Sequence, residues 1–223
     1  MTTLTISSDK KLTDFSKWQP ATWEEYLSYR DAPLTDRIRL YFYQNRLLIE
    51  MGSEGINHSN ISDLFTMLLA FWFTQKKPEQ IFSTFGRCLL EKPTEKIACA
   101  PDIVLYLGEN YPRWQSGERR YLDLDKWQVP NLVGEISDTT LASDLDEKKH
   151  LYSQLGIPEY WVVDVRGLRV IGFILTEGKY QETDQSLALE GLDIPLLEQT
   201  LTKLSEGSNG AAASWFAKEI GKS

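Results

Sequence analysis

Residues 131–136 read NLVGEI and residues 160–165 read YWVVDV, and between them residues 141–155 read LASDLDEKKHLYSQL. The second short run is apolar on both faces, which is typical of a central strand in a sheet. The long segment has apolar residues at helical spacing and is followed by Gly156, a common helix terminator. Strand, helix and strand together form a βαβ-sized unit, whose crossover is expected to be right-handed.

The rest of the chain surrounds this unit with helices and strands. A capping box, TWEE at 22–25, predicts a short N-terminal helix, and apolar alternation around residues 44–45 predicts a β-hairpin over 37–51. Helical spacing predicts a long amphipathic helix over 58–75. Further strands are predicted at 81–84, 87–90, 97–107, 169–175 and 178–182, and a further helix at 195–204. This order predicts an α/β fold, a mixed β-sheet flanked by helices, with an N-terminal helix and β-hairpin.

A chain of 223 residues with 42% hydrophobic residues is large enough for one sizeable domain. We expect this domain at 20–204, a polar lead-in at 1–19, and a flexible linker with a short final helix at 205–223. No apolar run reaches transmembrane length, and the N-terminus lacks a signal-peptide pattern. Cys88 and Cys99 are too few for a disulfide scaffold, so we expect a cytoplasmic protein that does not bind membranes.

Three charged residues interrupt apolar patterns in the middle of the chain. Asp102 begins a predicted strand directly after Pro101, and Glu135 lies within the first strand of the βαβ unit. At about 100° per residue, Lys148 falls near the centre of the apolar stripe of the following helix, so its ammonium group is expected to point towards the sheet. Buried charges are costly unless they are paired or bind a cation. The three residues therefore predict a site for a divalent metal ion and an anionic substrate.

Each of these positions also has a simpler interpretation. Asp102 can serve only to accept backbone N–H groups at the start of its strand. Glu135 can form a salt bridge with a nearby Arg or Lys. Lys148 can pair with Asp144 across one helical turn, with its stem covering apolar surface. Together, these interpretations describe a structural ion-pair network without a catalytic role.

The chemistry that these groups would support is phosphodiester hydrolysis. Two carboxylates, from Asp102 and Glu135, suit a hard divalent cation such as Mg²⁺, and the backbone carbonyl of Ile136 is a natural additional ligand. A metal-bound water is a better nucleophile, and a nearby lysine can orient or deprotonate that water and stabilise developing charge. Acyl transfer and zinc catalysis fit poorly, because the sequence shows no Ser–His–Asp constellation and no set of His and Cys ligands.

The motifs resemble those of the PD-(D/E)XK nuclease superfamily. They are PD at 101–102, GEIS at 134–137, the spacing Thr140–Asp144–Lys148–Tyr152, and GIPEYWVVD at 156–164. The chain is more closely similar to a family of restriction endonucleases abundant in cyanobacteria, the Uma-two type, over about residues 20–185. The resemblance implies a restriction-endonuclease-like fold, a nuclease site that uses Mg²⁺ or Mn²⁺, and binding to DNA.

The resemblance also assigns roles position by position. Asp102 matches the first acid of the motif and Glu135 the second. Ser137 stands where a lysine is usual, and Lys148 on the next helix matches the lysine role in this family. Two accessory residues follow, His58 before the long helix, where such proteins often carry a histidine, and Asp144 one turn before Lys148.

One part of the family pattern is missing. Its members often carry a glutamate in the first strand of the hairpin, where this chain reads RIRLYF at 37–42. Glu50 or Glu54 would have to take that role. The missing carboxylate and the net charge of −8 favour a second interpretation, a catalytically degraded protein of the nuclease fold that acts as a binding or assembly module.

Nucleic-acid contacts are predicted despite the negative net charge, because basic residues gather locally. The long polar loop at 109–125 carries most of them, and the βαβ helix adds one more. The predicted contacts are Arg113, Trp114, Arg119, Arg120 and Lys149. Trp114 is included because an aromatic ring beside an arginine can stack on a base. A homodimer is also expected, since nucleases of this kind often pair to cut both strands.

Overall fold

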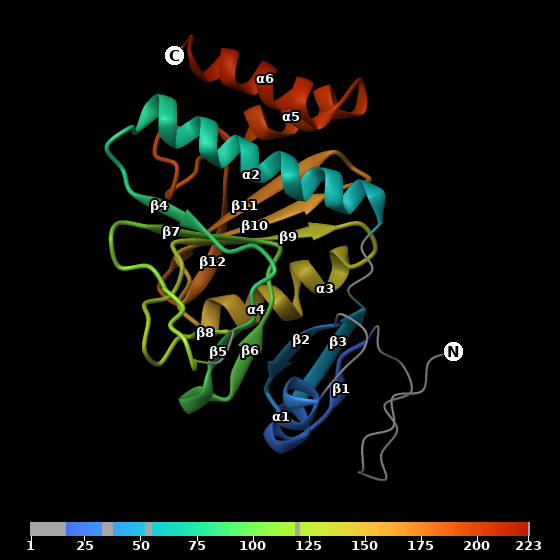
Figure 1. Cartoon of the computed structure of the whole chain (residues 1–223). Coiled ribbons are helices and arrows are strands. Elements are labelled where there is room, and N and C mark those ends of the chain that lie inside the picture. The colour runs from blue at the N-terminus through green and yellow to red at the C-terminus, as the bar shows by residue number, and fades with distance from the viewer. Residues whose placement is uncertain (1–16, 33–37, 52–54, 119–120, 223) are drawn as a thin grey trace.

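The computed structural model describes residues 17–32, 38–51, 55–118 and 121–222, which form two mixed β-sheets with flanking helices (Figure 1). Sheet A has the order β1 (Gln19–Pro20), β3 (Arg46–Met51), β2 (Ile38–Tyr43), β6 (Ile97–Cys99), β5 (Leu90–Lys92) and β8 (Leu122–Asp123). Sheet B has the order β12 (Lys179–Thr183), β11 (Arg169–Thr176), β10 (Glu159–Asp164), β9 (Leu132–Ser137), β7 (Ile103–Leu107) and β4 (Phe82–Thr84). The predicted α/β fold class is confirmed, with the strands divided between two sheets.

The predicted βαβ unit lies at the centre of sheet B, where β9 and β10 run parallel. Their connection consists of two short helices, α3 (Leu141–Leu145) and α4 (Glu147–Gln154), instead of the single helix predicted. The chain bends at Asp146, which has φ −120° and ψ −86°. Just before the bend, the Asp144 carboxylate accepts hydrogen bonds from the hydroxyl groups of Ser137 and Thr140. These local bonds hold α3 against the end of β9, and α4 then starts in a new direction.

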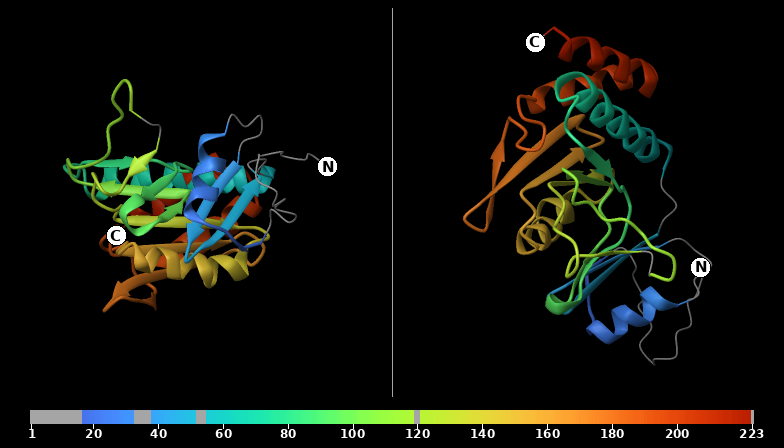
Figure 2. Two further views of the ribbon diagram at one scale, coloured as in Figure 1. Left: turned by 90° about the horizontal axis from the view of Figure 1, so that it is seen from below. Right: turned by 60° about the vertical axis from the view of Figure 1, so that its left-hand side comes forward.

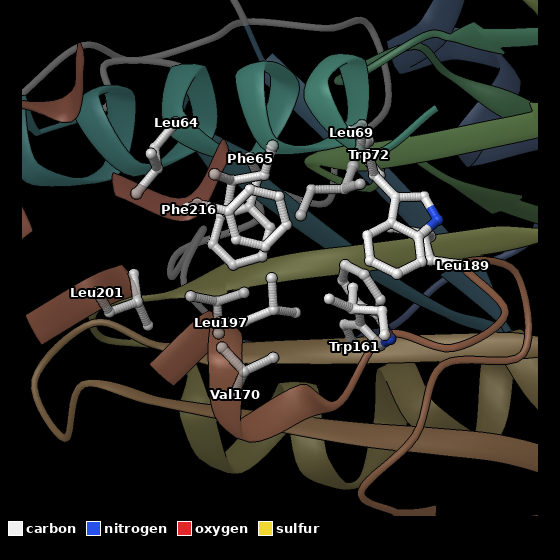
Figure 3. Close-up of a cluster of buried hydrophobic side chains, with 14 of the residues drawn as sticks. Leu64, Phe65, Leu69, Trp72, Trp161, Val170, Leu189, Leu197, Leu201 and Phe216 are labelled. Atoms are coloured by element: carbon white, nitrogen blue, oxygen red, sulfur yellow. The ribbon is translucent and has the colours of Figure 1, made fainter. Parts of the chain in front are cut away.

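Helices cover both faces of sheet B (Figure 1). One face carries α2 (Ile56–Lys76), α5 (Ile194–Ser205) and α6 (Asn209–Ile220), and the other carries α3 and α4. Figure 3 shows the core on the first face, where Phe65 and Trp72 of α2 lie near Trp161 of β10 and Phe216 of α6. The predicted helix over 58–75 is confirmed as α2. None of the helices in the described residues has the length and apolar character needed to cross a bilayer.

The N-terminal hairpin belongs to sheet A and lies at the opposite end of the molecule from α5 and α6 (Figure 2). Its outer face packs on the N-terminal helix, α1 (Trp23–Asp31), through a cluster that includes Tyr26 and Phe42. The turn residues Gln44 and Asn45 have φ values of 49° and 55°, which the type I′ hairpin turn requires. The predicted N-terminal helix and hairpin are confirmed.

The strand predicted over 97–107 is divided between the two sheets. Its first part is β6 of sheet A and its second part is β7 of sheet B. Pro101 lies between them, and because it has no backbone N–H, it cannot continue a ladder. The chain therefore leaves one sheet and enters the other at residues 100–102, which places Asp102 at the crossing.

The C-terminal segment differs from the flexible linker expected at 205–213. Only a short turn at 206–208 follows α5, and the hydroxyl group of Ser208 caps α6 by accepting the N–H of Ala211. Ala212 and Ala213 are buried beside α2. The small residues that suggested flexibility instead let α6 approach the core closely. Of the expected lead-in, residues 1–16 lie outside the described part of the chain.

Removing the ring of Phe216 tests whether α6 belongs to the core. Phe216 is fully buried, so Phe216→Ala is expected to lower the free energy of unfolding by about 3–5 kcal/mol through lost apolar burial and the cavity left behind. Urea denaturation measures this change. Leu187→Ala is the control, because Leu187 is 54% exposed and its loss should change little. A loss no larger than that of the control would contradict the packing of α6.

Candidate active site

The candidate site lies where the second face of sheet B meets α3, α4 and the hairpin. Ile103 of β7 pairs with Gly134 of β9, and the two strands are antiparallel. Asp102 comes directly before Ile103 and Glu135 directly after Gly134, so the two acids are neighbours across the strands. Strand alternation turns the Glu135 carboxylate onto the face that carries Val104, and the Asp102 carboxylate lies between this face and His58 in the first turn of α2. Asp102 is 3% exposed and Glu135 1% exposed. The two predicted acids are therefore brought together in a buried position.

Glu135 is held by groups from two other elements. Tyr152 of α4 donates a hydrogen bond to Oε1. The hydroxyl of Tyr41 in β2, which donates to the carbonyl of Ala100 at 2.9 Å, lies 3.4 Å from Oε2. The Nζ atom of Lys148 lies 3.4 Å from the same Oε2. Burial raises the pKa of Glu135 well above its usual range, the Lys148 ammonium lowers it only in part, and neighbouring carboxylates raise it further.

Lys148 is 1% exposed and points towards the sheet, as its place on the helix predicted. Its Nζ atom lies 2.9 Å from Oε1 of Glu50 and 3.0 Å from Oδ1 of Asp144. The same atom is 4.2 Å from the centroid of the Tyr41 ring, which adds a cation–π contact. Burial alone lowers the pKa of the lysine, but Glu135 and the other acidic neighbours outweigh it, so the pKa is raised well above the usual value. The amine therefore stays protonated. The predicted pair with Asp144 is present, together with the contact to Glu135 of the sheet.

Asp102 is engaged at both carboxylate oxygens. Arg39 of β2 donates to Oδ1, while Oδ2 accepts the backbone N–H of Ile136 at 2.9 Å and lies 3.0 Å from Nε2 of His58. Burial alone raises the pKa of Asp102, but the His58 hydrogen bond and the Arg39 guanidinium outweigh it, and the pKa is lowered. The N–H and C=O of one strand residue point to the same side, so the Ile136 carbonyl also faces towards Asp102.

The hairpin supplies residues that the sequence analysis did not assign to the site. Arg39 and Tyr41 occupy alternate positions of β2, and Glu50 of β3 lies directly opposite Arg39, with its Oε2 atom 3.0 Å from Nη2. Glu50, one of the two residues expected to replace the missing carboxylate, therefore lies between Arg39 and Lys148, and its role as that replacement stays a prediction. Glu54 lies outside the described residues. The sequence feature that could have identified these residues is the period-two pattern of β2, which places Arg39 and Tyr41 together on the face opposite the apolar positions.

Ser137, which occupies the position of the usual lysine, supports Lys148 indirectly. Its hydroxyl donates to Oδ2 of Asp144, and Thr140 donates to the same oxygen at 2.6 Å. The other oxygen of Asp144 faces Lys148. Ser137 therefore orients the carboxylate that pairs with the lysine.

The charges of this cluster do not balance. The carboxylates are those of Asp102, Glu135, Glu50 and Asp144, and the permanent cations are Arg39 and Lys148. When all four carboxylates are ionised, four negative charges face two positive charges, and two negative charges are in excess. Within the described ranges, no three His, Cys, Asp or Glu side chains are grouped so that they could hold a metal ion. The cluster thus has the oxygen donors and the charge for a hard cation, but not a preformed cage.

Those of the predicted nucleic-acid contacts that the structure describes pair with groups outside this cluster. The Nζ atom of Lys149 is 4.1 Å from the centroid of the Phe173 ring, and the Arg113 guanidinium is 4.7 Å from that of Tyr111. Trp114 is 58% exposed. Arg119 and Arg120 lie outside the part of the chain that the structure describes. Contact of these residues with nucleic acid stays a prediction.

Comparison with known proteins identifies the family. The model of the family Uma2, described as "Putative restriction endonuclease", matches residues 23–209. The chain belongs to the Uma2 family. A solved structure with a similar fold is described as "a putative nuclease belonging to DUF820" from Anabaena variabilis; it is 18% identical, the alignment covers 88% of this chain and 99% of that chain, and the TM-score is 0.53. At this identity the likeness shows the fold alone. Curated protein sequences contain no match.

Membership of Uma2 confirms the resemblance drawn from the motifs between residues 101 and 164. The match begins at Trp23, the first residue of α1, and ends at Asn209, the first residue of α6. It therefore includes the hairpin, all of sheet B, sheet A except β1, and every residue of the cluster around Lys148. The function that the Uma2 family suggests is that of a nuclease.

Replacing Lys148 tests whether its ammonium holds the cluster together. Lys148→Met keeps an apolar chain but leaves three carboxylates without their shared cation. Breaking a buried ion pair from one side costs about 3–5 kcal/mol, and we expect a loss of this size in urea denaturation. The double variant with Glu135→Gln should lose less than the sum of the two single changes. Additive losses would contradict the direct interaction.

The raised pKa of Glu135 predicts a pH dependence of stability in the absence of metal. Folded protein keeps a proton on Glu135 at pH values where the unfolded chain has lost it, so the free energy of unfolding should fall as the pH rises above the usual titration range of a carboxyl group. Glu135→Gln should flatten this slope and be the more stable form at high pH. Thermal denaturation in EDTA measures both profiles, with Glu182→Gln as an exposed control. Parallel profiles for wild type and Glu135→Gln would show that Glu135 is ionised throughout.

Proposed function

We propose that this chain is a metal-dependent endonuclease that hydrolyses phosphodiester bonds of DNA, with Mg²⁺ or Mn²⁺ as cofactor. The observation that carries the proposal is the Lys148 ammonium group, which is buried beside Glu135, the neighbour of Asp102 across the two strands. Well-packed apolar residues would stabilise the fold at least as well as buried charges. Charges of this kind in one cluster, with strongly shifted pKa values, are typical of functional sites.

The donor chemistry of the site fits a divalent cation. Asp102 and Glu135, with the carbonyl of Ile136, would hold the ion, and its charge would offset the excess of two negative charges. The bound ion would supply an activated water and a counter-charge for the phosphoryl oxygens. Since Asp102 is bonded to Arg39 and His58, a metal ion would compete with these partners for its oxygens.

Lys148 would act as a fixed positive charge near the scissile phosphate. Its raised pKa favours this role over that of a general base, because the amine keeps its proton. Glu50 and Asp144 hold the ammonium in place, and the ring of Tyr41 covers one side of it. Arg39, once released from Asp102, would offer a second cation whose planar guanidinium suits a phosphate group.

A second candidate function is a catalytically degraded member of the family that serves as a binding or assembly module. The observation that favours it is the engagement of both Asp102 oxygens by protein groups. In that case the charged cluster would be structural. Glu135→Gln would then leave the biological effect of the protein unchanged.

Cellular location and assembly are part of the same proposal. The free thiols of Cys88 and Cys99 are in keeping with the reducing cytoplasm. A homodimer would allow cleavage of both strands of DNA, and this stays a prediction.

Cleavage of supercoiled plasmid DNA in Mg²⁺ or Mn²⁺ tests the proposal. Wild type should yield nicked or linear DNA, and EDTA should abolish the products. Lys148→Ala and Glu135→Gln should each lower the rate about 100-fold or more, since each removes a group that acts on the transition state. Linear product without a nicked intermediate would indicate paired sites.

Two exposed residues on β12 provide matched controls. Lys179→Ala and Glu182→Gln change the same residue types at exposed positions outside the cluster and should cleave like wild type. Circular dichroism shows whether each variant is folded, and Glu135→Gln is expected to fold even if Lys148→Ala does not. Equal cleavage by wild type and folded Glu135→Gln, or no cleavage of any DNA with either metal, would refute the endonuclease.

A further inference from the structure

A pocket of about 310 Å³ lies beside the candidate active site, under the long loop that follows β7. Four aromatic residues line it: Phe85, Trp114, Tyr121 and Trp127. Its volume is at the low end of the range of small-molecule sites, roughly 300–1,000 Å³. Arg113 and Glu118 add polar groups to the lining. These walls suit a flat ring with polar edges.

The Trp114 ring is fixed in place although it is exposed. Its indole N–H donates to the backbone carbonyl of Glu118 at 3.0 Å, and the Glu118 carboxylate accepts the N–H of Gln115 at 3.0 Å. These bonds close the loop around the ring. A fixed indole at the edge of a pocket offers a stacking surface at low entropic cost.

Among the residues that the structure describes, the lining carries one cation, Arg113, and one carboxylate, Glu118, which already accepts the N–H of Gln115. The Arg113 guanidinium stacks over the ring of Tyr111 and its Nη2 atom lies 3.2 Å from the Tyr111 hydroxyl. A cation in the lining disfavours a quaternary ammonium ligand, which aromatic cages otherwise bind well. It favours a ligand that joins a flat ring to an anionic group.

One turn connects this pocket with the candidate active site. Phe85 and Cys88 at the two ends of the turn line the pocket, and the N–H of Cys88 donates to the carbonyl of Phe85 at 3.1 Å. In the middle of the turn, a Cβ on Gly86 would lie 2.5 Å from the backbone oxygen of Asp102, so only glycine allows this approach. The turn that lines the pocket therefore packs directly against the backbone of Asp102.

We propose that the pocket binds one nucleobase of an unpaired strand, stacked on Trp114, next to the phosphodiester bond that is cut. This inference rests on the proposed nuclease function and names the form of its substrate. A base in a continuous duplex is already stacked on its neighbours, whereas an unpaired base can enter a pocket. The protein should therefore prefer single-stranded or locally unpaired DNA to blunt duplex DNA.

Binding of fluorescein-labelled DNA, followed by anisotropy in EDTA so that no strand is cut, tests this proposal. One probe is a single-stranded oligonucleotide, and the other is the blunt duplex of the same sequence. Trp114→Ala should weaken binding of the single strand by about 5- to 150-fold, the loss of one stacked base, and change duplex binding little. Trp114→Phe should recover most of the affinity, because it restores a ring.

Leu187→Ala is the control, because Leu187 is a large exposed side chain outside the pocket. Single-strand binding that Trp114→Ala does not weaken, or weakens no more than duplex binding, would overturn the proposal. The nuclease proposal is judged separately by the plasmid assay. If Glu135→Gln loses cleavage but Trp114→Ala binds single-stranded DNA like wild type, only the proposal for the pocket is refuted. If Trp114→Ala weakens single-strand binding but wild type cleaves no DNA, only the nuclease proposal is refuted.

Discussion

The structure depends on the burial of one ammonium group. Lys148 reaches from α4 into a space bounded by β9, α3 and the hairpin, and each of these elements contributes a carboxylate to it. A charge out of water is tolerated only where its partners are all in place. The lysine thus joins two sheets and a helical layer, and the geometry of the site is inseparable from the packing of the fold.

Asp102 is the second point at which the sheets meet. The chain passes from sheet A to sheet B immediately before it, and its two oxygens bind Arg39 of sheet A and the Ile136 N–H of sheet B. Charges therefore alternate without interruption from Asp102 through Arg39 and Glu50 to Lys148, and the His58 ring is bonded to Asp102 at one end. A charged ligand that enters the site must replace some of these ion pairs, because each charged group in the row already contacts the next one.

Much of this site could be predicted from the sequence, because it follows from local geometry. Helical spacing placed Lys148 on the inner face, and the break at Asp146 did not change this because α4 keeps its own buried stripe. The roles of Arg39 and Glu50 could not be predicted in the same way. They depend on how sheet A lies across sheet B, and that arrangement is set by contacts between distant segments.

Glu91 shows a further limit of sequence reasoning. It is as deeply buried as Glu135, but Arg30 binds both of its oxygens and Tyr26 donates a hydrogen bond to it. This group holds α1 against β5 and has no open chemistry. Nothing in the sequence around Glu91 distinguishes it from a catalytic carboxylate, since the difference lies in partners that are about sixty residues away along the chain.

The turn at Gln44 and Asn45 has a consequence for how this family can change its loops. Strand side chains alternate between faces, so the length of the turn decides which residues of β3 lie opposite β2. One added residue would shift the register and rotate Glu50 out of the site, although the change lies several residues away from it. Two added residues would preserve the alternation. Insertions in this exposed turn therefore keep Glu50 in the site only when they add an even number of residues. A surface loop of the same size elsewhere in the chain would not have this restriction.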